Sequence, residues 1–310
     1  MYARHHAALI ALALISVPTS AFCQKIKREL VVKNNGHKLH LTSYSGSGKP
    51  AHSSLTVVFE SGLGGGEENW RPVIDQLPED VQAITYGGPG FDGSEADGVT
   101  PSPEHIATVL HTALSQLTTP PYLLVGHSWG GPLIRAFAGM FPKEISGLVF
   151  VDPTDFNETA AGRKQYVFGP LNHTEDSEAI RAAIDRYYAE QAGHFEPAVQ
   201  AEIDESRRSR TSDFAKLKTL PMPQVPLVIL ATTRYPFQVD KNLPAPFDQV
   251  MYQNLTLHYR LLSLSLFSRS VPEGTLATTA DSGHYIQRDE PALVSWAIDR
   301  VIHASPREQR

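Results

Sequence analysis

Residues 126–130 read Gly-His-Ser-Trp-Gly, between the apolar run Tyr-Leu-Leu-Val at 122–125 and the helical pattern Pro-Leu-Ile-Arg-Ala-Phe-Ala at 132–138. A G-x-S-x-G pentapeptide between a strand and a helix is typical of the nucleophile elbow, a sharp turn that presents the serine side chain. Glycines stand at 126, 130 and 131, where a larger side chain would clash with the neighbouring strand and helix. The alternative is a glycine-rich turn with an incidental serine. The context of the motif favours Ser128 as a nucleophile.

Apolar runs alternate with helical patterns on both sides of this pentapeptide. Continuous apolar strands separated by helices indicate a parallel sheet that is covered on both faces. Asn-Asn-Gly at 34–36 predicts a tight turn, so we expect the sheet to begin with an antiparallel hairpin. The expected strands are 29–33, 38–42, 55–59, 82–85, 122–125, 147–151, 226–231 and 275–279, and the expected helices are 68–77, 103–116, 129–141, 248–267 and 291–302.

The alternation of strand and helix patterns stops between about residues 153 and 225, where polar helical patterns at 177–191 and 197–209 occur without a clear strand. We interpret this stretch as a small helical cap inserted into the sheet domain. A separate domain is the alternative, and it is disfavoured because ~70 mostly polar residues would form a thin core.

The first residues are typical of a secretory signal peptide: a basic leader, an apolar run at 7–17 and small residues at 18–24. The apolar run is about half of the ~20 residues that a membrane span needs. We therefore predict a signal peptide at 1–23 and one domain at 24–310 that is secreted or periplasmic and not stably inserted in a membrane. A lipoprotein is less favoured, because Phe22 occupies a position where that pattern has a small residue.

Composition excludes several classes of protein. With 41% hydrophobic and 19% charged residues, the 310-residue chain can bury a large core. The net charge of −6 and the lack of an extended basic cluster argue against a nucleic-acid surface. Cys23 is the only cysteine, which excludes an internal disulfide. We also find no His, Asp and Glu spacing that predicts a metal site.

A serine hydroxyl is a poor nucleophile at neutral pH and needs a base that is itself oriented by a third group. His284 is the favoured base, because Asp-Ser-Gly-His at 281–284 follows the last expected strand. This places it at the carboxyl edge of the sheet, where the elbow opens. The alternative is a histidine on a surface loop.

Two further stretches complete a resemblance: Val-Phe-Glu-Ser-Gly-Leu-Gly at 58–64 and Tyr-Gly-Gly-Pro-Gly-Phe-Asp-Gly-Ser at 86–94. With the elbow and the Ser-Gly-His loop, they resemble the α/β-hydrolase superfamily from about residue 25 to 304, closest to its capped esterase-like and lactonase-like members. The resemblance implies an α/β fold with a mostly parallel sheet of about eight strands, helices on both faces and a small helical cap. Ser61-Gly62 departs from the usual His-Gly, and Gly87-Gly88 from the usual Asp-Arg.

The resemblance also implies an oxyanion hole built from the amides of Trp129 and Leu63, with Gly64 as the alternative to Leu63. Backbone N–H groups donate the hydrogen bonds to the oxyanion, so a change of side chain at Ser61 leaves the oxyanion hole possible. A phosphate-binding loop is excluded, because no Gly-Lys-Ser/Thr follows.

Two residues, Asp152 and Asp240, are candidates for the acid that orients the histidine. Relatives usually carry it a few residues after the strand expected at 226–231, but this chain has no carboxylate there until Asp240. Other members carry it one strand earlier, where Val-Phe-Val-Asp occupies 149–152. We favour Asp152, which would lie beside the elbow and hold the far imidazole nitrogen of His284; its alternative role is to cap a turn.

Other candidate residues have structural interpretations. We expect His127 to pack beside the nucleophile, Trp70 to lie in the core or a pocket wall, and Glu60, Glu67 and Glu68 to form a loop and a helix start.

The residues and the resemblance together predict a secreted serine hydrolase that cleaves a carboxylic ester or lactone of a small-molecule substrate through an acyl-enzyme, without a cofactor or metal. Ser128 would attack, His284 would act as base and then acid, and Asp152 would orient it. A serine at the elbow counts against family members with an aspartate nucleophile. One alternative is an aminopeptidase or amidase similar to proline iminopeptidases, whose oxyanion loop normally reads His-Gly-Gly-Pro-Gly. The other is a catalytically silent binding protein.

Overall fold

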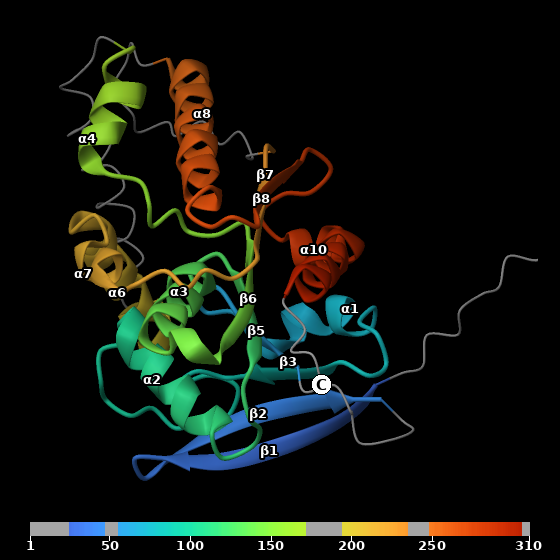
Figure 1. Ribbon diagram of the computed structural model, residues 1–310. Helices are drawn as coiled ribbons and strands as arrows, with labels where there is room; N and C mark the ends of the chain where they lie inside the picture. The colour runs from blue at the N-terminus through green and yellow to red at the C-terminus, as the bar shows by residue number, and fades with distance from the viewer. Residues whose placement is uncertain (1–24, 47–54, 172–193, 235–247, 306–310) are drawn as a thin grey trace, which may run out of the picture.

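The computed structural model describes residues 25–46, 55–171, 194–234 and 248–305. They contain one eight-stranded sheet in the order β1-β2-β4-β3-β5-β6-β7-β8 (Figure 1). Only the pairs β1–β2 and β2–β4 are antiparallel, and the other pairs are parallel. The predicted α/β fold is therefore confirmed. The strands are β1 (Ile26–Asn34), β2 (His37–Ser45), β3 (Thr56–Glu60), β4 (Gln82–Tyr86), β5 (Tyr122–His127), β6 (Ile145–Val151), β7 (Leu227–Thr232) and β8 (Gly274–Thr279).

Helices cover both faces of the sheet. One buried apolar cluster joins one sheet face to α2, α3 and α8, and a second joins the other face to α1 and α10. Figure 1 shows α1 and α10 on the opposite side of the sheet from α2 and α3. The helical segments are η1 (Glu67–Trp70), α1 (Arg71–Ile74), α2 (Pro103–Leu114), α3 (Gly130–Met140), η2 (Pro142–Glu144), α4 (Ala160–Arg163), η3 (Lys164–Phe168), α6 (Pro197–Thr211), α7 (Ala215–Thr219), α8 (Gln249–Ser268), α9 (Ile286–Asp289) and α10 (Pro291–Ala304).

The central strand β5 explains why the sequence reads as an unbroken apolar run before the elbow. All six of its residues are buried. Leu124 belongs to the cluster under α2 and α3, whereas Leu123 belongs to the cluster under α1 and α10. A strand that is buried on both faces needs apolar residues at every position. This burial fixes the end of β5, and therefore the start of the elbow.

Two elements differ from the expectation. The helix expected over 68–77 is a 3-10 turn followed by the single α-turn of α1, because Pro72 has no amide proton and fits only the first turn of a helix. The hairpin strands β1 and β2 are longer than expected, and the turn between them has Asn35 and Gly36 at φ 49° and 91°. These angles are those of the tight turn that the Asn-Gly pair predicts.

The segment between β6 and β7 contributes helices and no strand within its described part. Of its predicted helices, 197–209 corresponds to α6, whereas 177–191 lies outside the described residues, as do residues 1–23 and Asp240. The short helices α4, η3 and α7 were not expected. Figure 1 shows α4 beside α8, and the Tyr259 hydroxyl on α8 accepts a 3.1 Å hydrogen bond from the Thr159 amide at the start of α4. In the described part of the chain, every helix is too short or too polar to cross a membrane.

Candidate active site

The elbow holds Ser128 in a strained backbone conformation between β5 and α3. Its φ is 51°, in the left-handed region that non-glycine residues rarely adopt. Two hydrogen bonds fix this turn to the end of β6: the Ser128 amide donates to the Val151 carbonyl at 3.1 Å, and its carbonyl accepts from the Thr154 amide at 2.8 Å. At Gly130 a Cβ would lie 2.6 Å from the Glu60 carbonyl oxygen, which explains the need for glycine there. The elbow is therefore bound to both neighbouring strands.

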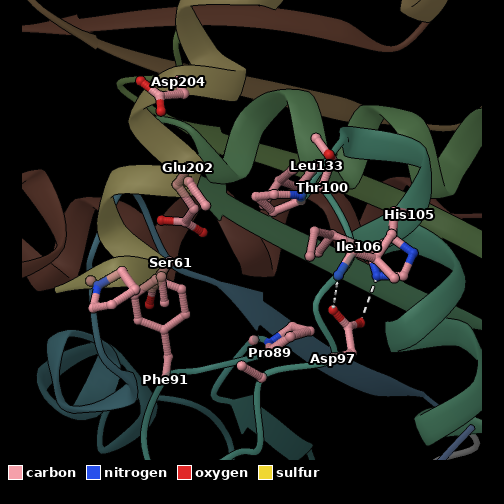
Figure 2. A pocket seen from close by; sticks show the side chains of 18 of the residues that line it. Ser61, Pro89, Phe91, Asp97, Thr100, His105, Ile106, Leu133, Glu202 and Asp204 are labelled. Carbon is pink, nitrogen blue, oxygen red and sulfur yellow. Dashed lines mark hydrogen bonds and ion pairs between the residues drawn. The ribbon is translucent and has the colours of Figure 1, made fainter.

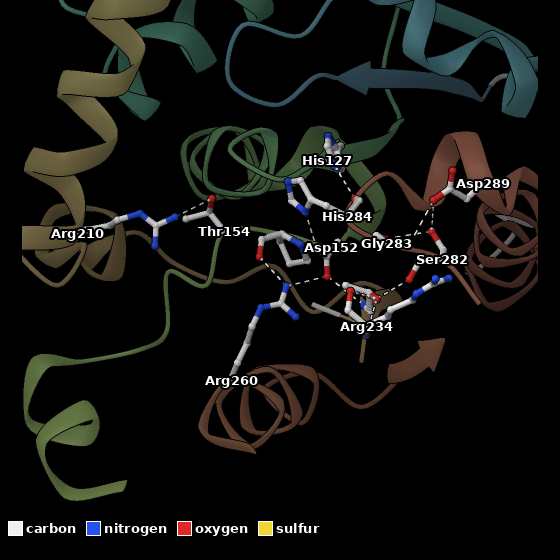
Figure 3. Close-up of polar contacts among 12 residues, drawn as sticks. His127, Asp152, Thr154, Arg210, Arg234, Arg260, Ser282, Gly283, His284 and Asp289 are labelled. Atoms are coloured by element: carbon white, nitrogen blue, oxygen red, sulfur yellow. Dashed lines mark hydrogen bonds and ion pairs between the residues drawn. The ribbon is translucent and has the colours of Figure 1, made fainter. Parts of the chain in front are cut away.

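Asp152 follows β6 directly and reaches the imidazole of His284. Its Oδ2 lies 2.6 Å from His284 Nδ1, although the two residues are 132 positions apart (Figure 3). The Asp152 side chain is 1% exposed and its φ is 41°. The backbone is held by its amide, which donates to the Leu230 carbonyl at 2.7 Å. The structure thus brings together two of the predicted site residues, Asp152 and His284, at the carboxyl edge of the sheet.

The other oxygen of this carboxylate has partners of its own. Oδ1 accepts a 3.0 Å hydrogen bond from the Thr232 amide at the end of β7 and one of 2.9 Å from Nη2 of Arg260 on α8. Burial alone would raise the pKa of Asp152, but the hydrogen bond with His284, the charge of Arg260 and the Thr232 amide together lower it. The carboxylate is therefore held ionised and in one orientation.

The loop that carries His284 is fixed by three polar contacts. The Thr232 hydroxyl donates to the Ser282 carbonyl at 2.6 Å, and the Ser282 hydroxyl donates to Asp289 at 3.0 Å. His127 Nε2 lies 2.9 Å from the His284 carbonyl oxygen, which can only accept, so Nε2 carries the proton. Burial, with the neighbouring His284 charge, lowers the pKa of His127 to about 4, which keeps its imidazole neutral. His127 packs beside the elbow as expected, and it also anchors the His284 loop.

The Ser61–Gly66 loop touches the elbow. A Cβ at Gly62 would lie 2.9 Å from Ser128 Cβ, so only glycine permits this approach. The Ser61 hydroxyl accepts a 3.1 Å hydrogen bond from the Trp70 indole and donates one of 3.0 Å to the Gly66 carbonyl. Ser61 thus links the two ends of the loop to each other and to the buried Trp70. The departure from His-Gly in the sequence leaves the loop well anchored.

The backbone amides of this loop differ in their partners. The Gly64 amide donates to Glu202 Oε2 on α6 at 2.9 Å. Within the described ranges, no hydrogen bond uses the amide of Leu63 or of Trp129. These two amides are therefore available to a ligand, whereas that of Gly64 is not. Of the two alternatives in this loop, the geometry favours Leu63 over Gly64.

A cavity of about 420 Å³ adjoins this loop at Gly62 (Figure 2). Part of its wall is apolar, including Phe91, Ile106 and Leu133. The cavity also contains two buried carboxyl groups, those of Glu60 and Glu202. It therefore offers an apolar surface and acidic groups close to the elbow.

Both carboxyl groups are shifted by their surroundings. Burial raises the pKa of Glu60 to about 8, against the opposing hydrogen bond that Tyr86 donates to it, and the Glu202 charge raises it further. Burial also raises the pKa of Glu202 to about 7, although the Gly64 amide opposes the shift. The expectation of a loop at Glu60 was wrong: it is the last residue of β3, and its side chain is buried because β3 lies between β4 and β5.

Sequence reasoning missed three residues that contact the site. Arg260 left a signal: it is the only Lys, Arg, Asp or Glu in α8, and a buried charge normally has a partner. Thr232 acts through its backbone amide, which the sequence cannot single out. Glu202 lies in a helix with many charged residues, so nothing marks it.

Comparisons with known proteins agree with this geometry. A family model described as "alpha/beta hydrolase fold" matches residues 56–196. The crystal structure of Cfl2 from Burkholderia cenocepacia superposes with a TM-score of 0.56 at 19% identity, over 91% of this chain and 97% of that one. The chain therefore has the α/β-hydrolase fold.

Three curated relatives extend the likeness to sequence. The protein YqjL of Bacillus subtilis is 25% identical over 247 residues, which are 79% of this chain and 83% of YqjL. The poly(3-hydroxyalkanoate) depolymerase of Ectopseudomonas oleovorans is 27% identical over 149 residues, 45% of this chain and 50% of the depolymerase. Another relative is monoacylglycerol lipase ABHD6 of Homo sapiens, which is 25% identical over 120 residues, 38% of this chain and 35% of the lipase.

The buried Glu60 carboxyl predicts a pH dependence of stability. Its pKa of about 8 lies above the ~4.3 of an unfolded chain, so the folded state binds more protons between these values and stability falls as the pH rises. We expect Glu60→Gln to reduce the loss in free energy of unfolding between about pH 5 and about pH 8 by about 1 kcal/mol or more. Urea unfolding at both pH values measures this loss. The exposed Glu29→Gln is the matched control, and an equal loss in all three proteins would contradict the assignment.

Proposed function

We propose that this protein is a serine hydrolase that cleaves a carboxylic ester or lactone through an acyl-enzyme intermediate. Ser128 is the nucleophile, His284 the general base and then acid, and Asp152 the group that orients His284. The observation that carries the proposal is the 2.6 Å contact between Asp152 and His284 at the sheet edge where the strained Ser128 turn opens. Asp152 and His284 are 132 positions apart in the sequence and meet at this edge, beside the elbow.

In this mechanism the Ser128 hydroxyl attacks the substrate carbonyl carbon while His284 Nε2 takes its proton. The tetrahedral oxyanion accepts hydrogen bonds from the amides of Leu63 and Trp129. The intermediate collapses, the alcohol leaves with the proton from His284, and water then attacks the acyl-enzyme with His284 again as base. Asp152 keeps Nδ1 protonated and stabilises the imidazolium that forms at each step.

Several observations support the finer parts of the proposal. The depolymerase relative and the position of the cavity beside Gly62 favour ester chemistry, with the acyl part of the substrate in that cavity. Glu202 on α6 lines the cavity, which supports a role of residues 153–225 as the cap over the substrate. We further propose that residues 1–23 direct secretion of the mature chain.

Covalent labelling tests the nucleophile. We expect a fluorophosphonate to modify Ser128, because an activated serine attacks its phosphorus as it would an ester carbonyl. Ser128→Ala should lose about 10³-fold or more of its turnover of short-chain aryl esters and take up no label. Peptide mapping by mass spectrometry locates the adduct.

Matched aryl amides in the same assay distinguish an esterase from an amidase of the same fold. An adduct at another residue, or undiminished turnover by Ser128→Ala, would rule out the mechanism. Absence of both label and turnover in the wild-type protein would favour a silent binding protein.

Two substitutions separate the candidate acids. Asp152→Asn should lower kcat by about 10³-fold to 10⁴-fold, because the amide favours the wrong imidazole tautomer. Asp240→Asn, which lies outside the described residues, should retain most activity. Steady-state kinetics on one aryl ester measures both. A large loss in Asp240→Asn alone would transfer the acid to that residue.

The acidic cavity predicts selection by substrate charge. A carboxylate on the acyl chain would meet Glu60 and Glu202, whose charges increase as the pH rises. We expect kcat/KM for an aryl hemisuccinate to be about 10-fold lower than for the matched neutral butyrate. The ratio of the butyrate value to the hemisuccinate value should be larger at about pH 8 than at about pH 6. Glu202→Gln should reduce this ratio. A ratio near one at both pH values would place the acyl group elsewhere.

A further inference from the structure

Arg260 is a buried cation in a helix that is otherwise almost without charge. The 20 residues of α8 contain no other Lys, Arg, Asp or Glu. Its side chain is 9% exposed, and Nη2 lies 2.9 Å from Asp152 Oδ1 and 3.0 Å from the Pro153 carbonyl oxygen. Withdrawing a guanidinium from water is costly unless such partners compensate for the lost solvation. Its position therefore depends on Asp152 and on the turn that follows it.

Because of this contact, the two oxygens of Asp152 have different partners. Arg260 and the Thr232 amide hold Oδ1, whereas Oδ2 accepts from His284. A carboxylate held at one oxygen cannot rotate without breaking those bonds, so Oδ2 stays directed at the imidazole (Figure 3). Arg260 also bonds the carbonyl after Asp152, which supports the left-handed backbone at φ 41°.

We propose that Arg260 is a positioning residue for the base: it orients the Asp152 carboxylate toward His284 and offsets part of its charge. This inference rests on the proposed function. The first effect keeps the imidazole aligned with Ser128. The second reduces the negative charge that Asp152 presents to the imidazole, and replacing Arg260 with a neutral residue would restore that charge.

Other charged or titratable groups lie around the pair and stay unchanged in the test. His127 from β5 packs against the His284 ring, with 4.6 Å between centroids. Arg288 from α9 lies close enough to His127 to disfavour its protonated form. Arg234 follows β7, where its amide bonds the Thr232 hydroxyl at 2.9 Å. Of the groups that the structure describes, Arg260 is the one cation in contact with Asp152 besides His284.

The test compares the pH profiles of kcat/KM for Arg260→Gln and Arg260→Lys. Glutamine keeps a hydrogen-bond donor and removes the charge, whereas lysine keeps the charge but replaces the rigid, planar guanidinium with a flexible ammonium group. We expect Arg260→Gln to lower kcat by ~10-fold to 100-fold with little change in KM. The acid limb of the pH profile of kcat/KM for Arg260→Gln should move to higher pH by about one unit, since the cation no longer offsets the charge of Asp152. Arg260→Lys should lose kcat but keep the wild-type limb.

Arg163→Gln is the matched control. Arg163 is a half-buried arginine that also pairs with a carboxylate, Glu158, at 3.0 Å, and it donates to the Tyr252 hydroxyl on α8 at 3.3 Å. It should leave the acid limb in place. An unmoved limb in Arg260→Gln, or the same displacement in Arg163→Gln, overturns the positioning role. If Arg260→Gln does not fold, Arg260→Lys decides, because a displaced limb there contradicts the proposal. Active Ser128→Ala would instead contradict the proposed function itself.

Discussion

The carboxylate of Asp152 is the point on which the geometry of this site depends. It is almost fully buried, and each of its oxygens is held by a different part of the chain: Oδ1 by β7 and α8, and Oδ2 by the loop after β8. A buried charge is tolerated only while its partners remain in place. Asp152 therefore ties the arrangement of the site to the folding of the whole carboxyl edge of the sheet.

The register of the parallel strands explains how such distant residues meet. His127 pairs with Val151 across β5 and β6, and Val151 pairs with Leu230 across β6 and β7. Thr232 in turn pairs with Thr279 across β7 and β8. Neighbouring strands lie ~4.8 Å apart, so residues that follow these pairs emerge in a row within side-chain reach. Ser128 and Asp152 directly follow β5 and β6, and the loop after β8 brings His284 back to within 2.6 Å of Asp152.

The sequence predicted those features that depend on neighbouring residues, namely the strands and the elbow turn. Apolar runs marked the strands because β5 and its neighbours are buried on both faces, and the Gly positions of the elbow marked a turn that a Cβ would obstruct. What it missed depends on contacts across long separations. The bonds from Arg260 to Asp152 and from Gly64 to Glu202 span 108 and 138 residues, and neither leaves a periodic signal. Of the short helices after β6, α4 and η3 contact α8 and α7 contacts α3, and no local propensity specifies these contacts.

The acid that we propose follows a different strand from the one that the family resemblance most often implies. That resemblance usually implies a carboxylate after the strand that is β7 here, but this chain has Thr232 at that strand end and offers its amide instead. Since β6 and β7 are adjacent, a carboxylate from either strand end can reach the same imidazole. A side chain that crosses from β6 toward the β8 loop, however, passes over the end of β7 and needs support there. The Thr232 amide supplies one donor on that path and Arg260 the other, so Asp152, the acid that we propose, and the buried cation on α8 form one arrangement.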